Sequence, residues 1–171
     1  PLLSEPNLQQ QLVEIGYQGK KLEELEGLSA TEKANMLFIV QDPYTSYYDA
    51  KVVRDFVALT QKLGFEPIIL PFKPNGKAMH IKGFLTRFSK TAKTQAEFLN
   101  RVAKLNVPLV GVDPAIVLSY RDEYKEALGN SRGDFHVLTA HEWLTNQLES
   151  NALQSAVKNI AKSDCNFEWH L

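Results

Sequence analysis

Two aspartates stand where an acidic side chain could do chemistry. Asp42 and Asp113 each follow a short apolar run and each precede a proline. A carboxylate at such a turn can face a ligand, but Asp is also a common N-cap and Pro fits the first turn of a helix. We expect Asp113 to cap a helix. Near Asp42 we expect the helix to start later, with Ser46 as its cap and Asp49 completing a pair resembling a capping box, which leaves Asp42 freer to face a ligand.

A stretch of positive charge is the sharpest local feature. No acidic residue lies between Glu66 and Glu97, whereas the remainder of the chain has thirteen basic and twenty acidic residues. The six basic residues of the stretch are Lys73, Lys77, Lys82, Arg87, Lys90 and Lys93. The formal net charge of −1 argues against binding of nucleic acid or a membrane surface by the domain as a whole, so any electrostatic site is local.

The start of this stretch could hold an anion. Lys73-Pro74-Asn75-Gly76-Lys77 is a turn-forming sequence whose N–H and ammonium groups could bind a carboxylate or phosphate. His80 follows and could act as an acid, a base or a hydrogen-bond donor. The spacing differs from a P-loop, and no Gly-x-Gly-x-x-Gly occurs. The alternatives are a solvated basic face between domains and a structural role for His80.

Aromatic residues gather near the same turns. Tyr44, Tyr47, Tyr48 and Tyr120 could stack on a planar ligand, although tyrosines at strand–helix turns mostly pack at the rim of a core. We expect Phe84, Leu85 and Phe88 to form a buried helical face. The residues that we take as candidate ligand or interdomain contacts are Asp42, Tyr44, Lys73, Asn75, Gly76, Lys77, His80, Asp113, Tyr120 and Arg121.

No catalytic constellation or metal site is expected in this chain. Cys165 is its one cysteine, which excludes an internal disulfide and a cluster held mainly by its own thiolates. His136 and His141 have the wrong spacing for a helical metal pair, and no Gly-x-Ser-x-Gly or metalloprotease motif occurs.

The elements that must position these residues follow from hydrophobic patterning. Each of four short apolar runs is too uniformly apolar for a half-exposed strand, so we expect strands buried on both faces. Between and after them lie helical patterns. The sequence therefore predicts an α/β fold of the Rossmann-like three-layer type: an open, mostly parallel sheet of four to five strands with helices on both faces, and ligands outside the carboxyl ends of the strands. The expected strands are 36–40, 67–70, 108–112, 135–138 and a fifth within 165–171; the expected helices are 49–63, 94–105 and 142–160.

The domain arrangement follows from length and composition. A chain of 171 residues suits one domain. We expect residues 1–35 to form an N-terminal helix near 7–15 and a polar connector, and residues 36–171 to form the α/β domain. We expect that domain to be truncated at its C-terminal end, leaving an edge at which two copies could pair. With no long apolar run and no signal peptide, we expect a cytoplasmic chain without a transmembrane segment.

Several whole segments carry a resemblance to a known family. The segments are 39–50, 70–77, 80–84 and 111–124, and the resemblance spans about residues 36–145. The chain resembles the C-terminal region of the large bacterial D-2-hydroxyacid dehydrogenases that contain FAD and iron–sulfur clusters, a group that includes D-2-hydroxyglutarate and D-lactate dehydrogenases. This region is similar to the cysteine-rich CCG-type repeat domain of heterodisulfide reductases and glycolate oxidase iron–sulfur subunits.

The resemblance implies a parent with FAD and [4Fe-4S] cofactors in a flavin module and a ferredoxin-like module, the expected partners of this chain. A typical repeat carries cysteines after its strands, where this chain has Gln41-Asp42-Pro43, Pro74-Asn75-Gly76 and Val112-Asp113-Pro114. The chain therefore resembles a degenerate repeat that kept its turns and lost its thiolates. The resemblance implies no cofactor in this chain, and a peripheral association of the parent with the inner membrane remains compatible with it.

Three hypotheses for function remain open. The first is a non-catalytic domain fragment of such a dehydrogenase, whose parent oxidises a D-2-hydroxyacid to the 2-oxoacid. The second is an independent α/β domain that binds a small anionic or nucleotide-like ligand. The third is a purely structural adaptor between domains.

Overall fold

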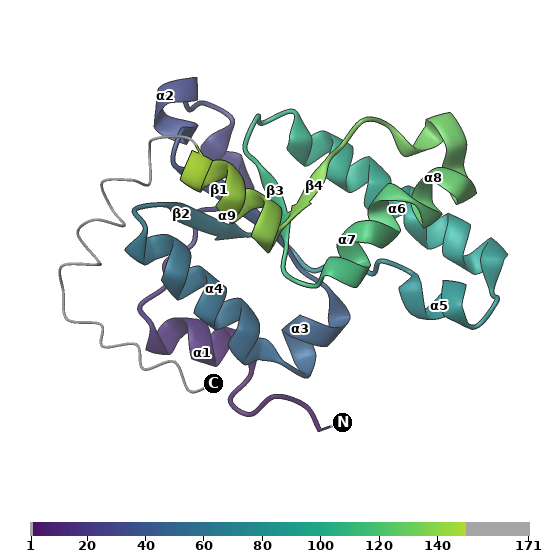
Figure 1. The fold of residues 1–171 in the computed structure, drawn as a ribbon, viewed down its shortest axis with the longest axis horizontal. Helices are drawn as coiled ribbons and strands as arrows, with labels where there is room; N and C mark the ends of the chain where they lie inside the picture. Colours follow the sequence, from purple (N-terminus) through teal and green to yellow (C-terminus); the bar gives the residue numbers. More distant parts are fainter. Residues whose placement is uncertain (1, 150–171) are drawn as a thin grey trace.

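Four short apolar runs form the strands of one open, parallel sheet (Figure 1). The computed structural model describes residues 2–149. Its strands run in the order β2-β1-β3-β4, with helices packed around the sheet, so the expected α/β class is confirmed. The bounds are β1 Met36–Val40, β2 Glu66–Ile69, β3 Leu109–Gly111 and β4 Val137–Thr139.

Alternate residues of β1 point into two separate hydrophobic clusters, one on each face of the sheet. Phe38 and its alternate neighbours belong to one cluster, and Leu37 and Ile39 belong to the other. All five residues of β1 are buried, which is the pattern of a central strand covered on both faces. The two clusters are the two cores of a three-layer arrangement.

Helices on the two sides supply the outer layers (Figure 1). Residues of α1 (Leu8–Glu14), α4 (Ala50–Lys62) and α9 (Ala140–Glu149) pack in the cluster around Leu37, and residues of α6 (Leu85–Ala103), α7 (Pro114–Arg121) and α8 (Glu123–Leu128) pack in the cluster around Phe38. Shorter elements are α2 (Ala30–Lys33), α3 (Pro43–Tyr47), α5 (Lys77–Ile81) and the 3₁₀ turns Leu22–Leu25 and Gly129–Arg132.

The strand order fixes where a ligand crevice would lie. From β1 the chain crosses by α4 to β2 on one side, and from β2 it crosses by α6 to β3 on the other side of β1. The order of the strands therefore reverses between β1 and β3, and in open parallel sheets this switch point is the usual ligand crevice. The turns after β1 and β3 carry Asp42 and Asp113.

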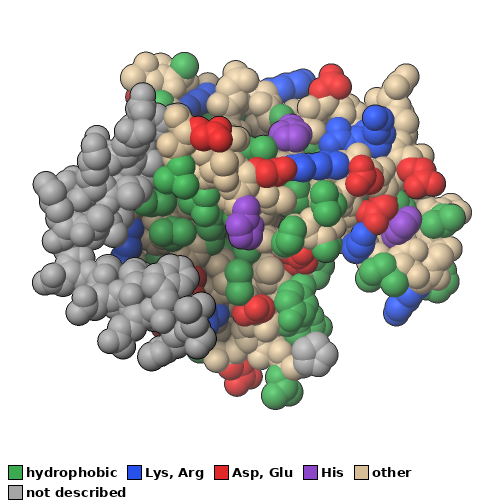
Figure 2. Space-filling model, viewed as in Figure 1, with side chains coloured by type: hydrophobic (Ala, Val, Ile, Leu, Met, Phe, Trp, Pro, Cys, Tyr) green, Lys and Arg blue, Asp and Glu red, His purple; other side chains and the backbone are tan. Residues whose placement is uncertain are grey.

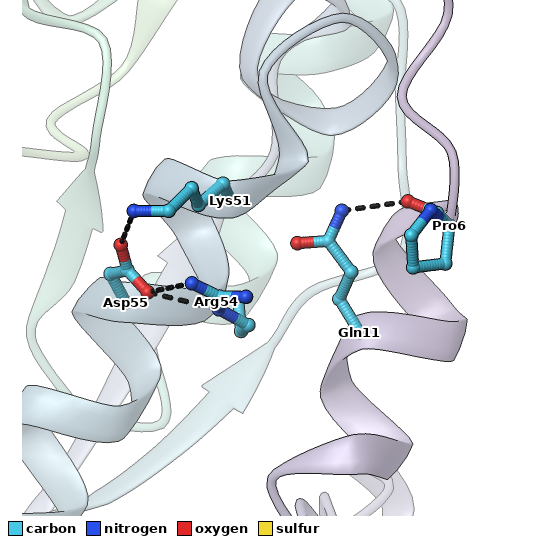
Figure 3. Close-up of polar contacts among 5 residues, drawn as sticks. All are labelled: Pro6, Gln11, Lys51, Arg54 and Asp55. Carbon is cyan, nitrogen blue, oxygen red and sulfur yellow. Dashed lines mark hydrogen bonds and ion pairs between the residues drawn. The ribbon is translucent and has the colours of Figure 1, made fainter.

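The N-terminal segment packs onto the sheet domain. Leu8 and Leu12 of α1 lie in the cluster around Leu37, and Leu25 is fully buried in the other cluster. Gln11 of α1 donates its side-chain N–H to the backbone oxygen of Pro6 at 2.6 Å. Figure 3 shows this contact beside α4, where Asp55 pairs with two basic side chains of the same helix, Lys51 and Arg54.

The helix expected at 94–105 begins earlier, at Leu85. Its buried stripe begins with Phe88, Ala92 and Ala96, one turn apart, and continues through Leu99 and Val102, a spacing that leaves polar residues on the remaining surface. Phe88 is buried as expected, but Phe84 and Leu85 are exposed, so the expected burial of those two is wrong. The last expected helix reaches Glu149; its continuation and the fifth strand fall outside the described residues.

Among residues 2–149, no helix has the length and apolar composition needed to cross a membrane.

Candidate functional site

The turn that follows β2 is organised by Asn75 and Gly76. The Asn75 side-chain oxygen accepts from the backbone N–H of Lys77 at 3.0 Å, a local turn that asparagine commonly forms. Gly76 has φ +80° and N-caps α5. A Cβ at Gly76 would lie 2.9 Å from the Phe88 ring, so glycine is required both by the backbone and by the close approach of α6.

Lys77 follows this turn, and its side chain reaches α8. Its ammonium group forms an ion pair with Glu123, and both side chains are about three-quarters buried, at 23% and 22% exposed. His80 Nδ1, one turn along α5, lies 3.9 Å from the same carboxylate. Burial acts to raise the pKa of Glu123, but the Lys77 ammonium, the nearby Ser119 hydroxyl and the His80 ring together lower it. The Lys77 charge is therefore already compensated within the chain.

Two buried tyrosines fill the space beneath this pair. Tyr124 donates its hydroxyl to the backbone oxygen of Asn75 at 2.6 Å, and Tyr120 accepts from the Gln95 amide at 3.4 Å. Their rings meet edge to face at 5.1 Å, and Phe88 packs on Tyr124 at 5.7 Å. Burial is the main cause that raises the pKa of both tyrosines, so both hydroxyls remain protonated and neutral. This aromatic packing belongs to the core cluster on one face of the sheet.

Asp42 and Asp113 both cap helices. Asp42 is 2% exposed and accepts from the backbone N–H groups of Tyr44 and Thr45 at 2.8 and 2.9 Å, and also from the Thr45 hydroxyl. The expectation that this helix starts later, with Ser46 as cap, is wrong: α3 begins at Pro43 because Asp42 satisfies its first free N–H groups. Asp113 accepts from the Ala115 N–H at 2.8 Å, so its expected capping role is confirmed.

The other candidates lie apart from this cluster. Lys73 is exposed, with its ammonium group 5.7 Å from the centre of the Phe98 ring. Tyr44 stacks on Tyr48 with ring centres 6.3 Å apart. Arg121 forms a bidentate pair with Glu142 and also donates to the Val137 backbone oxygen at 2.8 Å.

The structure thus brings together Asn75, Gly76, Lys77, His80 and Tyr120 from the sequence candidates. Sequence reasoning missed the partners that close the cluster, which are Gln95, Ser119, Glu123 and Tyr124. The spacing of Tyr120 and Tyr124, one helical turn apart, was the available signal for an aromatic face. No sequence signal links Lys77 to Glu123, because they pair across 46 positions.

A hollow of about 760 Å³ lies away from this cluster, between α1 and the ends of β1 and β2. It is lined by apolar residues of α1, including Leu8 and Leu12, and by polar side chains such as Gln41 and Ser46. Of the aromatic candidates, Tyr47 lines it. Lys20 also borders it but pairs with Glu66 at 2.9 Å.

The cluster does not suit an iron–sulfur group or a flavin. Iron–sulfur clusters are held by cysteine thiolates, and the turns at Asp42, Asn75 and Asp113 supply side-chain oxygens that already accept from backbone N–H groups. In the described part of the chain, no group of three histidine, cysteine or acidic residues could hold a metal ion. The buried rings of Tyr120 and Tyr124 occupy the space next to the Asn75 turn that the ring system of a flavin would need.

Comparison with known proteins places the whole chain within longer relatives. It is 78% identical over all 171 residues to the D-2-hydroxyglutarate dehydrogenase of Haemophilus influenzae, and covers 17% of that protein. It is 65% identical over 150 residues to the D-2-hydroxyglutarate dehydrogenase of Escherichia coli, and 35% identical over 152 residues to that of Pseudomonas putida, covering 15% of each. The chain matches one segment of these dehydrogenases.

The chain thus spans about one-sixth of the length of the curated relatives that it matches. No family model matches it, and no solved structure matches it significantly. The similarity to relatives of this name agrees with the dehydrogenase group indicated by the sequence.

Proposed function

We propose that this chain is a non-catalytic segment of a D-2-hydroxyglutarate dehydrogenase. The observation that carries the proposal is 78% identity along the whole chain to a protein of that name, of which the chain forms 17%. In the proposed parent, an FAD- and iron–sulfur-dependent oxidoreductase of the cytoplasm, D-2-hydroxyglutarate is oxidised to 2-oxoglutarate and electrons leave through the clusters. The binding of both cofactors falls to other parts of that parent.

The contacts in the chain support a structural role. Lys77 and Glu123 neutralise each other, Asp42 and Asp113 are engaged in capping, and Tyr124 is bonded to the Asn75 turn. A general acid or base needs a group that is free to reach a substrate proton. With these groups committed to internal bonds, the segment serves best as a rigid wall against the flavin and ferredoxin-like modules of the parent.

The proposal is tested with the full-length protein that contains this chain. We expect it to convert D-2-hydroxyglutarate to 2-oxoglutarate with an artificial electron acceptor, to discriminate against the L-enantiomer, and to contain FAD, iron and acid-labile sulfide. Failure to oxidise any D-2-hydroxyacid would contradict the proposed activity. Oxidation of D-lactate in preference to D-2-hydroxyglutarate would contradict the substrate but not the reaction class.

The hollow beside α1 supports one alternative, an independent domain for a small anionic ligand. Calorimetry of the chain with phosphate and with D-2-hydroxyglutarate separates the two hypotheses. Saturable heat that is lost on Lys20→Ala would favour the binding domain, whereas the proposed structural segment gives no heat with either compound. Lys62→Ala, an exposed lysine at the end of α4, is the matched control.

A further inference from the structure

The turn between α5 and α6 exposes three large apolar side chains. Ile81, Phe84 and Leu85 are 72%, 52% and 57% exposed. Gly83, with φ +75°, turns the chain between them. Side chains of this size are normally exposed singly, so a contiguous group on a folded surface marks an interaction site. These exposures are the reason that the expected burial of Phe84 and Leu85 is wrong.

Basic residues border this apolar group. Lys82 lies within it and Arg87 lies beside it, with the Arg87 guanidinium 5.9 Å from the Phe84 ring centre. We call Ile81, Lys82, Phe84, Leu85 and Arg87 the α5–α6 tip. In the described part of the chain neither Lys82 nor Arg87 forms an ion pair. Figure 2 shows hydrophobic and basic side chains side by side over the region where α5 lies in Figure 1.

The α5–α6 tip has the composition of an interface with a charged rim. An apolar and aromatic centre carries most of the energy of an interface, and rim charges select a partner of opposite sign. The sequence adds an independent observation, because the stretch between Glu66 and Glu97 contains no acidic residue. A complementary partner would therefore present an apolar surface edged by carboxylates.

We propose that the α5–α6 tip docks on an acidic-edged apolar surface elsewhere in the same, longer polypeptide. The proposal rests on the proposed function, which supplies a parent about six times the length of this chain, as in relatives of which the chain covers 15–17%. A lipid surface fits less well. A helix that lies on a lipid surface presents a free apolar face, whereas the apolar face of α6 is buried in the core around Phe38 and α5 has only five residues.

The test is photo-crosslinking in the full-length protein. Phe84 is replaced by p-benzoylphenylalanine, which keeps an aromatic ring, and cross-linked peptides are mapped by mass spectrometry after irradiation. We expect an intrachain cross-link to a peptide outside the present 171 residues, rich in acidic and apolar side chains. Adding Arg87→Glu should reduce the cross-linked fraction by at least about fivefold, because like charges then face each other.

Lys104→Glu is the matched control, since it reverses an exposed cation at the other end of α6; it should leave the cross-linked fraction unchanged. A cross-link to a second copy, no cross-link, or Arg87-dependent sedimentation with phosphatidylglycerol vesicles would each overturn the proposal. Oxidation of D-2-hydroxyglutarate is assayed on the same samples. An active protein without the intrachain cross-link contradicts the docking alone, and an inactive protein with it contradicts the proposed activity alone.

Discussion

Asp42 and Asp113 occupy matching turns after neighbouring strands, yet their side chains form different numbers of hydrogen bonds. Asp42 is nearly fully buried and bonds two backbone N–H groups and the Thr45 hydroxyl. Asp113 is partly exposed and bonds one N–H group. Removing a cap costs about 1 kcal/mol, and leaving buried donors unpaired adds to this.

We therefore predict that Asp42→Ala lowers the free energy of unfolding by about 2–3 kcal/mol, and Asp113→Ala by about 1 kcal/mol. Urea denaturation followed by circular dichroism measures both. Equal losses would show that the buried bonds of Asp42 add nothing to its capping role.

The Lys77–Glu123 pair makes stability depend on pH. The pKa of Glu123 is lowered in the folded chain, so its stabilising effect is complete above the ordinary carboxyl pKa and is lost as the pH falls through the lowered one. We predict that Glu123→Gln lowers the free energy of unfolding by about 1–2 kcal/mol at neutral pH. The difference from the unmodified chain should vanish in the acid range. A difference that persists at low pH would assign the loss to packing rather than to charge.

At the scale of elements, the turn before α5 depends on glycine for two separate reasons. Gly64 and Gly76 both have positive φ, but a Cβ at Gly64 would meet open space while one at Gly76 would meet Phe88. Alanine in the left-handed region costs about 1 kcal/mol. We predict about that loss in unfolding free energy for Gly64→Ala and at least about twice as much for Gly76→Ala. Similar losses of unfolding free energy for the two variants would show that Phe88 of α6 shifts at little cost to make room for the added Cβ.

An element is predictable from the sequence when the residues that determine it lie within it, and not when they lie far away in the chain. The strands follow from uniformly apolar runs, so they were predictable. Both caps follow from an Asp-Pro dipeptide, but only the Asp113 cap was predicted, because the sequence near Asp42 also offered Ser46 as a later cap. The start of α6 was not, because Phe88 and Ala92 are separated by polar residues and mark a helix only once their packing face is known. Glu123 was missed because its partner is remote in sequence.

At the scale of the whole molecule, the parallel sheet brings the residues of the switch point together, and the chain fills that point with its own side chains. Tyr120 is buried close to the turns after β1 and β3: burial raises its pKa, and the charges of Asp42 and Asp113 raise it further. Tyr124 packs on Tyr120 and is buried next to Asn75. The exposed chemistry lies instead at the α5–α6 tip and around the hollow beside α1. This arrangement fits a segment that supports a larger enzyme from outside its reacting centre.

The most direct measurement of that claim is the turnover of the full-length protein carrying Lys77→Met with Glu123→Gln. This double variant removes both charges of the pair, so neither is left buried and unpaired. With D-2-hydroxyglutarate and an artificial acceptor, we predict kcat and KM within about twofold of the unmodified protein, because a group outside the reacting centre supplies no proton transfer. A fall in kcat of about 100-fold or more, the usual loss when a general acid or base is removed, would contradict the account and place this cluster in the catalytic site.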